Sequence, residues 1–379
     1  MAKPDRPPKG LPRDPVRALR ARELLADLRQ LVLAQRWKEA APKSHALIQI
    51  APDLAEGHDL MGQIALGTGA PAIAEGCFER AVAIGPATGS RLFNWASALL
   101  ALGEPAAAEP VLHRALLVRP DDPAILVQLG EAQLSQGRTD DALKSLRRAL
   151  KKQPDNHFAA HLVSALTNSG TPSRDYVTRL FDDYAGIFEE HLTQKLGYRV
   201  PEALATMLAG HIKPGAVALD LGCGTGLVAE ALATQVGQID GIDLAPKMIE
   251  QARAHGRYRH LAAGDCVEVM TSDSDFSGPY DLVCAADVFI YMGAIEAVLD
   301  TILTRLSPGG LIAFSVETTQ AEDIEIRASG RFAHAPAYID RLVTSRRLTL
   351  LADQPHVIRL EQEKPIAGHL YLVAKPQNA

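Results

Sequence analysis

The stretch Asp220-Leu-Gly-Cys-Gly-Thr-Gly226 follows a short apolar run and leads into a helical pattern that begins at Leu227. Glycine at every second position lets the backbone approach a ligand closely where a helix begins. A dinucleotide-binding loop would need glycine instead of Leu227, and the carboxylate of Asp220 would repel a pyrophosphate. That carboxylate suits a ligand that carries an ammonium group and a sulfonium cation.

Short β-rich runs alternate with helical segments around this loop, which is typical of a parallel sheet flanked by helices. The sequence predicts strands at 216–220, 238–242, 260–263, 281–284 and 311–315, and two closing strands near 357–361 and 369–373. Helices are expected between them, among them 227–235, 246–255 and 294–306. Ligands of such sheets bind at the carboxyl ends of the strands.

Acidic residues occur at the ends of three of these strands. At the end of the second strand, Asp243 can accept hydrogen bonds from both hydroxyl groups of a ribose. After the third, Asp265 and the backbone of Cys266 can hold an adenine, and after the fourth Asp287 lies beside the sulfonium end of such a ligand. Each acid alone also fits a helix cap or a turn. Their order along the strands predicts a nucleoside site.

The N-terminal half has an internal period of 34 residues. Proline recurs at this spacing, and an alanine stands twelve residues before each proline: Pro52, Pro86, Pro120 and Pro154, with Ala40, Ala74, Ala108 and Ala142. Smaller and larger residues keep the same register at Gly62, Ala96 and Gly130 and at Phe78, Leu112 and Leu146. The pattern predicts pairs of antiparallel helices, because small residues suit a close crossing and proline ends a helix.

This period resembles the tetratricopeptide repeat (TPR), and residues 173–379 resemble a class I S-adenosylmethionine-dependent methyltransferase, including the Ser-Pro-Gly-Gly turn at 307–310. The whole chain is similar to bacterial methyltransferases that carry such repeats, in the stretches 180–192, 196–201 and 330–335. The resemblance implies an α + α/β fold class, in which a TPR α-solenoid precedes a Rossmann-like methyltransferase domain with a seven-stranded sheet. The expected parts are a basic, Pro-rich tail (1–18), about four repeats with a capping helix (19–170) and the methyltransferase domain (173–379), joined at Ser-Gly-Thr-Pro-Ser (169–173).

The resemblance also implies that the cofactor is S-adenosyl-L-methionine and that the product is S-adenosyl-L-homocysteine. Tyr184 is expected to cover the bound donor, and Arg199 to pair with its carboxylate. The predicted donor site comprises Asp220, Gly222, Cys223, Gly224, Gly226, Asp243, Leu244, Met248, Asp265, Cys266, Asp287, Tyr184 and Arg199.

Transfer of a methyl group from a sulfonium needs a base only if the acceptor carries a proton with a high pKa. The candidates are His334 and Tyr291. Arg331, His334 and Tyr338 are expected on the acceptor side, with the last two on one face of a helix. Signatures of amino-methylation of adenine or glutamine and of cytosine C5 methylation do not occur in the sequence, and no acidic triad predicts a metal site.

Composition and charge indicate which kinds of binding partner and which cellular location to expect. A formal charge of −6 argues against a nucleic-acid partner, no apolar run reaches the roughly 18 residues of a membrane span, and four isolated cysteines suit a cytoplasmic protein. The repeat groove is expected to bind a protein. Asn94 matches one position of the basic clamp by which such repeats hold chaperone tails, but Asp59 and Ala124 do not fit it.

Two functional classes follow. The first is an active methyltransferase for a small-molecule or carrier-bound acceptor, with the repeats recruiting a protein partner. The second is an interaction scaffold whose donor-binding domain is weakly active or inactive. Between them stands a protein methyltransferase that presents its target in the repeat groove. The intact glycines and acids of the loop and strand ends favour the first class.

Overall fold

A computed structural model describes residues 10–167, 174–361 and 364–377 of the chain. The chain divides into two compact units, Met1–Ala159 and Ala160–Ala379. The predicted junction at 169–173 lies outside the described residues. Within the described ranges, no helix is long and apolar enough to cross a membrane.

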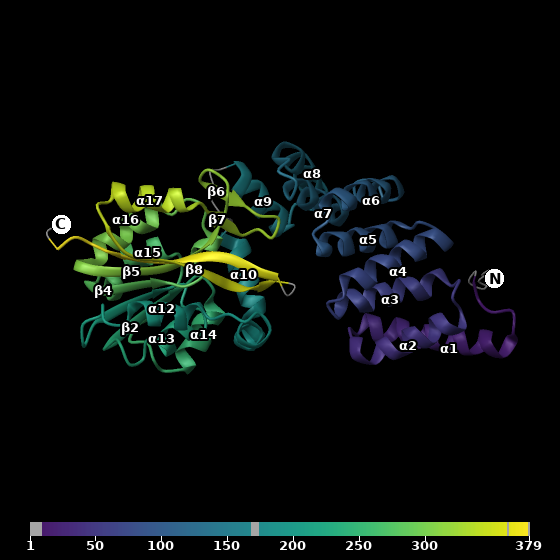
Figure 1. The fold of residues 1–379 in the computed structure, drawn as a ribbon, viewed down its shortest axis with the longest axis horizontal. Coiled ribbons are helices and arrows are strands. Elements are labelled where there is room, and N and C mark those ends of the chain that lie inside the picture. Colours follow the sequence, from purple (N-terminus) through teal and green to yellow (C-terminus); the bar gives the residue numbers. More distant parts are fainter. Residues whose placement is uncertain (1–9, 168–173, 362–363, 378–379) are drawn as a thin grey trace. The chain divides into compact units, whose positions relative to one another are not determined.

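Helical hairpins make up the first unit (Figure 1). In each hairpin an odd-numbered helix packs on the helix that follows it: α1 (Pro15–Leu33) on α2 (Trp37–Ile50), α3 (Ala55–Gly67) on α4 (Pro71–Ile84), α5 (Gly89–Leu102) on α6 (Pro105–Val118), and α7 (Pro123–Leu134) on α8 (Thr139–Lys152). The odd-numbered helices also contact one another in order, from α1 through α7. The predicted array of antiparallel helix pairs is confirmed.

The crossings within the hairpins depend on the small residues that the period identified. Ala74 and Ala108 are fully buried. A Cβ atom added to Gly62 of α3 would stand 2.6 Å from the ring of Phe78 in α4, and one added to Gly130 of α7 would stand 2.8 Å from Leu146 in α8. Glycine is therefore required at these positions by close packing rather than by an unusual backbone conformation.

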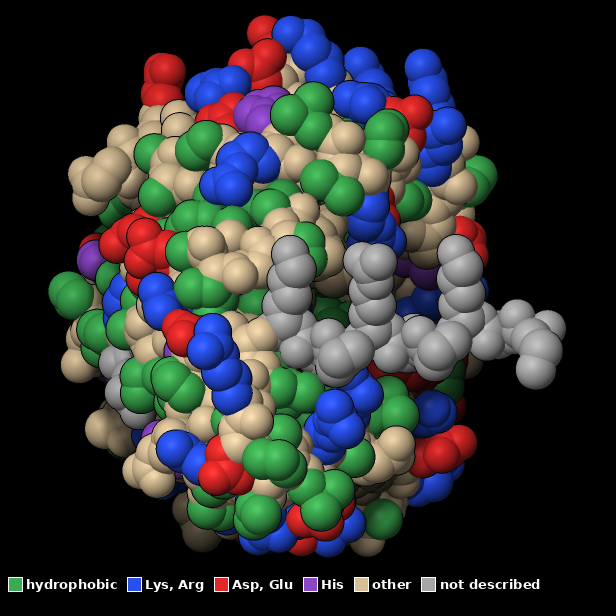
Figure 2. All heavy atoms as spheres, turned by 90° about the vertical axis from the view of Figure 1, so that its right-hand side faces the viewer, with side chains coloured by type: hydrophobic (Ala, Val, Ile, Leu, Met, Phe, Trp, Pro, Cys, Tyr) green, Lys and Arg blue, Asp and Glu red, His purple; other side chains and the backbone are tan. Residues whose placement is uncertain are grey.

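Charges of both signs are interspersed on the face of the molecule in Figure 2. In the first unit, several charged side chains pair across helices. Arg29, for example, pairs with Glu56, with two nitrogen–oxygen distances of 2.6 and 2.8 Å. Lys43 and Asp27 form a similar pair at 2.6 Å. Because these side chains are largely solvated, such pairs contribute little stability, and they serve mainly to keep the outer surface polar.

A mixed sheet forms the middle layer of the second unit (Figure 1). Among the described residues it has nine strands: β1 (Val217–Leu221), β2 (Gln238–Asp243), β3 (Leu261–Ala263), β4 (Tyr280–Ala285), β5 (Leu306–Thr318), β6 (Ile324–Ile326), β7 (Phe332–His334), β8 (Thr349–Glu361) and β9 (Lys364–Ala374). The order is β3-β2-β1-β4-β5-β7-β6, and β9 pairs antiparallel with both β5 and β8. The order reverses between β1 and β4, which is where ligands bind in open sheets of this kind.

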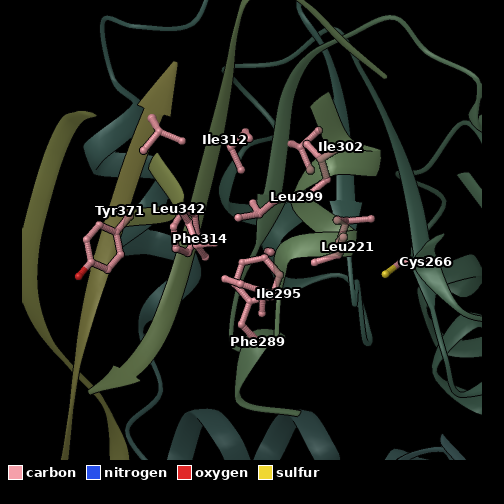
Figure 3. Close-up of a cluster of buried hydrophobic side chains, with 14 of the residues drawn as sticks. Leu221, Cys266, Phe289, Ile295, Leu299, Ile302, Ile312, Phe314, Leu342 and Tyr371 are labelled. Atoms are coloured by element: carbon pink, nitrogen blue, oxygen red, sulfur yellow. The ribbon is translucent and has the colours of Figure 1, made fainter. Parts of the chain in front are cut away.

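Helices cover both faces of this sheet (Figure 1). One face carries α12 (Val200–Leu208), α13 (Leu227–Ala231) and α14 (Pro246–Ala254), and the other α15 (Cys266–Ser272), α16 (Glu296–Arg305) and α17 (Pro336–Ser345). Figure 3 shows part of the core on the second face, to which Leu299 and Ile302 of α16 and Phe314 of β5 belong. Because both faces are covered, the inner strands are largely apolar, which made them recognisable in the sequence.

Two local predictions in this unit were wrong. Residues 330–338 do not form one helix, because Phe332–His334 pair with β5 and β6 and the helix α17 begins at Pro336. The stretch Ser307–Gly310 is not a turn before the fifth strand. It lies inside β5, where the pairing with β4 jumps from Leu306 to Leu311.

The second half of α9 (His157–Thr167) belongs to the second unit. His161 is fully buried there, with its Nε2 atom 2.8 Å from the carbonyl oxygen of Gly330. Its ring stacks on Tyr176 at a centroid distance of 4.5 Å and meets the edge of Phe332 at 6.3 Å.

We expect Gly62→Ala to lower the free energy of unfolding of the repeat unit by about 1–3 kcal/mol, because the new methyl group meets the fully buried ring of Phe78. Gly76→Ala is the matched control, since its Cβ would meet no atom within 4 Å and alanine favours the helix by about 1 kcal/mol. Urea unfolding followed by tryptophan fluorescence reports on this unit alone, because both tryptophans, Trp37 and Trp95, lie in it. Equal midpoints for the two variants would contradict the close crossing.

We expect residues 173–379 alone to bind S-adenosylhomocysteine with nearly the affinity of the full chain. The same fragment is expected to melt at a lower temperature than residues 156–379, because it lacks the buried contacts of His161. Calorimetry and thermal melting of the two fragments measure these effects. Identical melting temperatures of the two fragments would show that His161 has no stabilising role. A large loss of affinity for S-adenosylhomocysteine in both fragments would show that the repeats contribute to the donor site.

Candidate functional site

A cavity of about 840 Å³ opens at the carboxyl ends of β1, β2, β3 and β4. The backbone of Gly222 and Gly224 lines it, in the loop between β1 and α13. Both glycines have left-handed φ angles, 62° and 52°, and a Cβ atom on Gly222 would stand 2.6 Å from Val288. The loop therefore cannot keep this path with a larger residue at position 222.

Asp243, at the end of β2, holds this loop in place. Its carboxylate accepts hydrogen bonds from the backbone N–H groups of Gly224 and Ala245, both at 2.8 Å. Burial raises the pKa of Asp243, and these two N–H groups act in the opposite direction. Asp243 lines the cavity as well, so its remaining lone pairs are placed to receive the hydroxyl groups of a ribose.

Asp265 both caps a helix and lines the cavity. It caps α15, since its carboxylate accepts from the backbone N–H groups of Val267 and Glu268 at 3.0 and 3.1 Å. It also lines the cavity beside Cys266, and Arg174 of α10 (Arg174–Tyr184) stands 3.2 Å from it. The end of β3 is thus a polar corner of the cavity.

Asp220 lies beneath the glycine loop and is not in the described lining of the cavity. It is fully buried, and Tyr258 donates a hydrogen bond to its Oδ2 atom at 2.7 Å. Its Oδ1 atom has no hydrogen-bond partner among the described residues. Burial raises the pKa of Asp220 to about 7, so a cation near the loop would favour its charged form.

Aromatic rings cover one side of the cavity. They come from Phe181 and Tyr184 of α10, from Phe188 of α11 (Phe188–Glu190), and from Tyr291 in the 3₁₀ turn η4 (Phe289–Tyr291). The rings of Phe181 and Tyr291 meet edge to face at 5.0 Å, and those of Tyr184 and Phe188 at 5.3 Å. Tyr184 also contacts His191, the first residue of a π-helical turn (His191–Lys195). Rings in this arrangement can cover a bound donor and exclude water.

Nine of the thirteen predicted donor-site residues line the cavity: Gly222, Cys223, Gly224, Asp243, Leu244, Asp265, Cys266, Asp287 and Tyr184. Besides Asp220, three others are not in its described lining. Gly226 turns the chain into α13, with a φ of 111°. Met248 is buried against Ala185, and Arg199 is mostly exposed and pairs with Glu202 one turn along α12.

The acceptor-side prediction is only partly supported by the geometry. Arg331 lines the cavity, but His334 is fully buried and its Nε2 atom lies 2.8 Å from the carbonyl oxygen of Gly293. Burial also lowers the pKa of His334. Tyr338 donates to Glu296 at 2.8 Å and accepts from the N–H group of Ile295. The two side chains therefore support α16, because the strand at 332–334 turns His334 inward.

Asp287 belongs to a group of charged residues of which the sequence had also singled out Arg331, but not Arg359, Glu317 or Glu361. Arg359 of β8 donates to the carboxylate of Asp287 at 2.9 Å and also contacts Glu317 of β5. Arg331 stands 3.3 Å from Glu317 and donates to Glu361 at 2.5 Å. The feature of the sequence that could have identified Arg359 is that this arginine follows two apolar residues in β8, Val357-Ile-Arg359. Its partners lie 42 and 72 residues away, so the pairing required the fold.

Comparisons with known proteins agree with this geometry. Residues 219–312 match the family described as "Methyltransferase domain", and residues 93–157 match "Tetratricopeptide repeat". The chain is 34% identical over 108 residues to a ubiquinone biosynthesis O-methyltransferase of Xylella fastidiosa (27% of this chain, 42% of that protein). It is 32% identical over 151 residues to the biotin biosynthesis bifunctional protein BioCD of Bordetella avium (38% and 30%). The chain thus spans less than half the length of these relatives.

Two solved structures are similar to parts of this chain. The N-methyltransferase NodS from Bradyrhizobium japonicum, in complex with S-adenosyl-L-homocysteine, is 18% identical with a TM-score of 0.40, and the match covers 52% of this chain and 98% of that one. The TPR protein YrrB is 19% identical with a TM-score of 0.35, over 44% and 86% of the two chains.

The fold, the loop and the matched families define the second unit as a class I S-adenosylmethionine-dependent methyltransferase domain. The chain as a whole combines tetratricopeptide repeats with this domain. Its residues fit S-adenosylmethionine, because glycine backbone lines the cavity, Asp243 lines it as well, and a buried oxygen of Asp220 beneath the loop has no hydrogen-bond partner in the described part of the chain.

We expect Asp243→Ala to weaken binding of S-adenosylhomocysteine about a hundredfold, because the ribose and the N–H group of Gly224 both lose a charged acceptor. Asp243→Asn keeps the shape and one carbonyl oxygen, so its loss should be smaller. Glu250→Gln, which changes an exposed carboxylate on neighbouring α14, is the control. Calorimetry measures the affinities, and thermal melting verifies folding. A folded Asp243→Ala protein with unchanged affinity would remove Asp243 from the site.

Proposed function

We propose that this protein transfers a methyl group from S-adenosylmethionine to a small-molecule or carrier-bound acceptor, and that its repeats recruit a protein partner. The observation that carries the proposal is that one cavity is lined both by predicted donor-site residues and by residues outside that set, among them Arg331, Arg359 and Leu360. Its volume of about 840 Å³ is near the upper end of the roughly 300–1,000 Å³ typical of ligand pockets. It can therefore hold an acceptor beside the donor.

The chain's own contribution is binding, alignment and exclusion of water. When bound, the cofactor supplies a methyl group that is already activated by the positive sulfur. The loop from Gly222 to Gly224 and Asp243 hold the donor, which fixes the direction in which the methyl group points. The rings of Phe181, Tyr184 and Tyr291 limit the access of water to the cavity. Alignment of the methyl donor with the acceptor supplies most of the rate acceleration that the protein adds.

The relatives named ubiquinone biosynthesis O-methyltransferase support oxygen as the atom that receives the methyl group. The cavity walls support an acceptor with an apolar body, because Leu192, Leu196 and Pro201 line it. The alternatives are a protein methyltransferase and an inactive scaffold. An inactive scaffold is disfavoured, because an open cavity of this size and an intact loop serve no purpose in it.

The repeat surface supports a partner other than an acidic tail. The first helices of the hairpins carry Asp59, Asn94, Gln128 and Glu131, and Gln128 donates to Ser97 at 2.6 Å. Burial raises the pKa of Glu131 to about 7, and burial likewise raises that of Asp59. Amide and carboxyl groups of this kind suit the backbone and polar side chains of a peptide, whereas acidic groups at these positions would repel a carboxylate tail.

We expect the full chain to bind S-adenosylhomocysteine at one site per chain in calorimetry. Radiolabelled methyl transfer into a fractionated bacterial lysate should then label the small-molecule or carrier fraction, and Asp243→Ala should abolish the label. Label in ordinary proteins would favour the protein methyltransferase instead. If the full chain binds no S-adenosylhomocysteine, the proposal fails.

A further inference from the structure

We infer that Asp287 takes the proton of the acceptor's reacting group, and that this acceptor is an apolar, uncharged molecule that presents a hydroxyl group. The inference rests on the proposed function and names the substrate class and the proton acceptor of the same site. Asp287 follows β4, and its backbone has a φ angle of 59°. A positive φ is uncommon outside glycine, and Asp and Asn tolerate it best.

Neighbouring strands hold Asp287 in this conformation. Its backbone N–H group donates to the Oγ atom of Ser315 at 2.8 Å, and Ser315 is fully buried in β5. Its Oδ2 atom accepts from Arg359, whose side chain is only 5% exposed and also contacts Glu317. Two acids thus fix the arginine, and the arginine fixes one oxygen of Asp287.

The other oxygen of Asp287 has no such partner. Oδ1 is buried and makes no hydrogen bond to the described residues, although Asp287 lines the cavity. A buried carboxylate oxygen without a donor costs about 1–3 kcal/mol or more. A ligand that brings an O–H or N–H group to this position would supply the missing donor.

The protonation state of Asp287 suits the transfer of a proton. Burial raises its pKa to about 6, while Arg359 acts to lower it. The carboxyl is therefore charged near neutral pH, yet it is basic enough to accept a proton. Other charged and titratable groups act on Asp287 or on the residues that pair with it. Two of them lie on β8 and one on β5, and the others lie beside β6 and β7, in η4 and before α12. They are Arg359, Glu361, Glu317, Arg327, Arg331, Tyr291 and Tyr198.

Tyr291, the other predicted base that reaches the cavity, is less suited. Burial raises the pKa of its hydroxyl, and the nearby charge of Asp287 raises it further. Tyr291 therefore keeps its proton at neutral pH and cannot accept another from a hydroxyl group. It remains available to donate a hydrogen bond to the acceptor.

The charges that line the cavity indicate an uncharged acceptor. Each arginine in the described lining already has a carboxylate partner: Arg174 has Glu268, Arg331 has Glu361, and Arg359 has Asp287. An acceptor carboxylate would have to displace one of these acids. Much of the remaining lining is apolar or aromatic, including Leu196, Tyr198 and Leu360. A hydroxyl on a ring-bearing, apolar body fits both observations.

The reaction balances without a further reagent. The hydroxyl oxygen forms a bond to the methyl carbon as the bond between that carbon and sulfur breaks, and the electron pair of the broken bond stays on sulfur. The O–H proton passes to the Oδ1 atom of Asp287. The products are the methyl ether, S-adenosylhomocysteine and a protonated Asp287, which then releases its proton to water.

The test uses the full chain with two phenol probes, 4-ethylphenol and 4-ethyl-2-nitrophenol, at slightly alkaline pH. The first is neutral under these conditions and needs a base, whereas the second is largely ionised and does not. We expect Asp287→Asn to lower kcat for 4-ethylphenol by about a hundredfold or more, and for the nitrophenol by less than about tenfold. Asparagine tolerates the positive φ, so the variant should fold and should bind S-adenosylhomocysteine within about threefold of the wild type.

Two further measurements separate a base from a structural residue. Wild-type kcat/KM for 4-ethylphenol should fall as the pH drops through about 6, and Asp287→Asn should lack this decline. Asp353→Asn, on β8 and paired with His369, is the matched control and should behave as wild type.

Equal losses on both phenols, or no loss at all, would overturn the role of Asp287. A wild-type chain that binds S-adenosylhomocysteine but methylates neither phenol would overturn the acceptor class. Failure to bind S-adenosylhomocysteine would instead remove the proposed function itself.

Discussion

The hydrogen bonds from Gly224 and Ala245 to the carboxylate of Asp243 are the constraint on which the site depends. They tie the loop after β1 to the end of β2 at the edge where the strand order reverses. Because Asp243 is almost fully buried, an unpaired charge there would be strongly unfavourable, so the loop and the strand end are held as one piece. The glycines then take positive φ angles that only this path requires.

A second group of cavity residues consists of charges that neutralise one another. Arg359 is nearly inaccessible between Asp287 and Glu317, and Arg331 stands between Glu317 and Glu361. Buried ion pairs of this kind are weak contributors to stability, because desolvation offsets much of their attraction. Their benefit here is geometric, since they orient the carboxylate of Asp287 and leave one of its oxygens without a partner among the residues that the structure describes.

The two units are stabilised by different means. The hairpins of the first unit rely on close crossings, where Gly62 and Gly130 leave room for Phe78 and Leu146, and each hairpin mainly contacts its neighbours. The second unit relies on a sheet buried on both faces, with strand partners far apart in sequence. The array can therefore vary in its binding surface without disturbing the donor site.

Local and periodic features were determined by the sequence alone. The 34-residue period, the glycine loop and the acids Asp243, Asp265 and Asp287 were predictable, because each depends on near neighbours or on the end of a single strand. Only the tertiary structure decided which distant side chains meet. It turned His334 toward Gly293, added β6 and β7, and brought Arg359 to Asp287 across 72 residues. Burial and ion pairing between distant strands follow from strand order and register, which no single segment of sequence specifies.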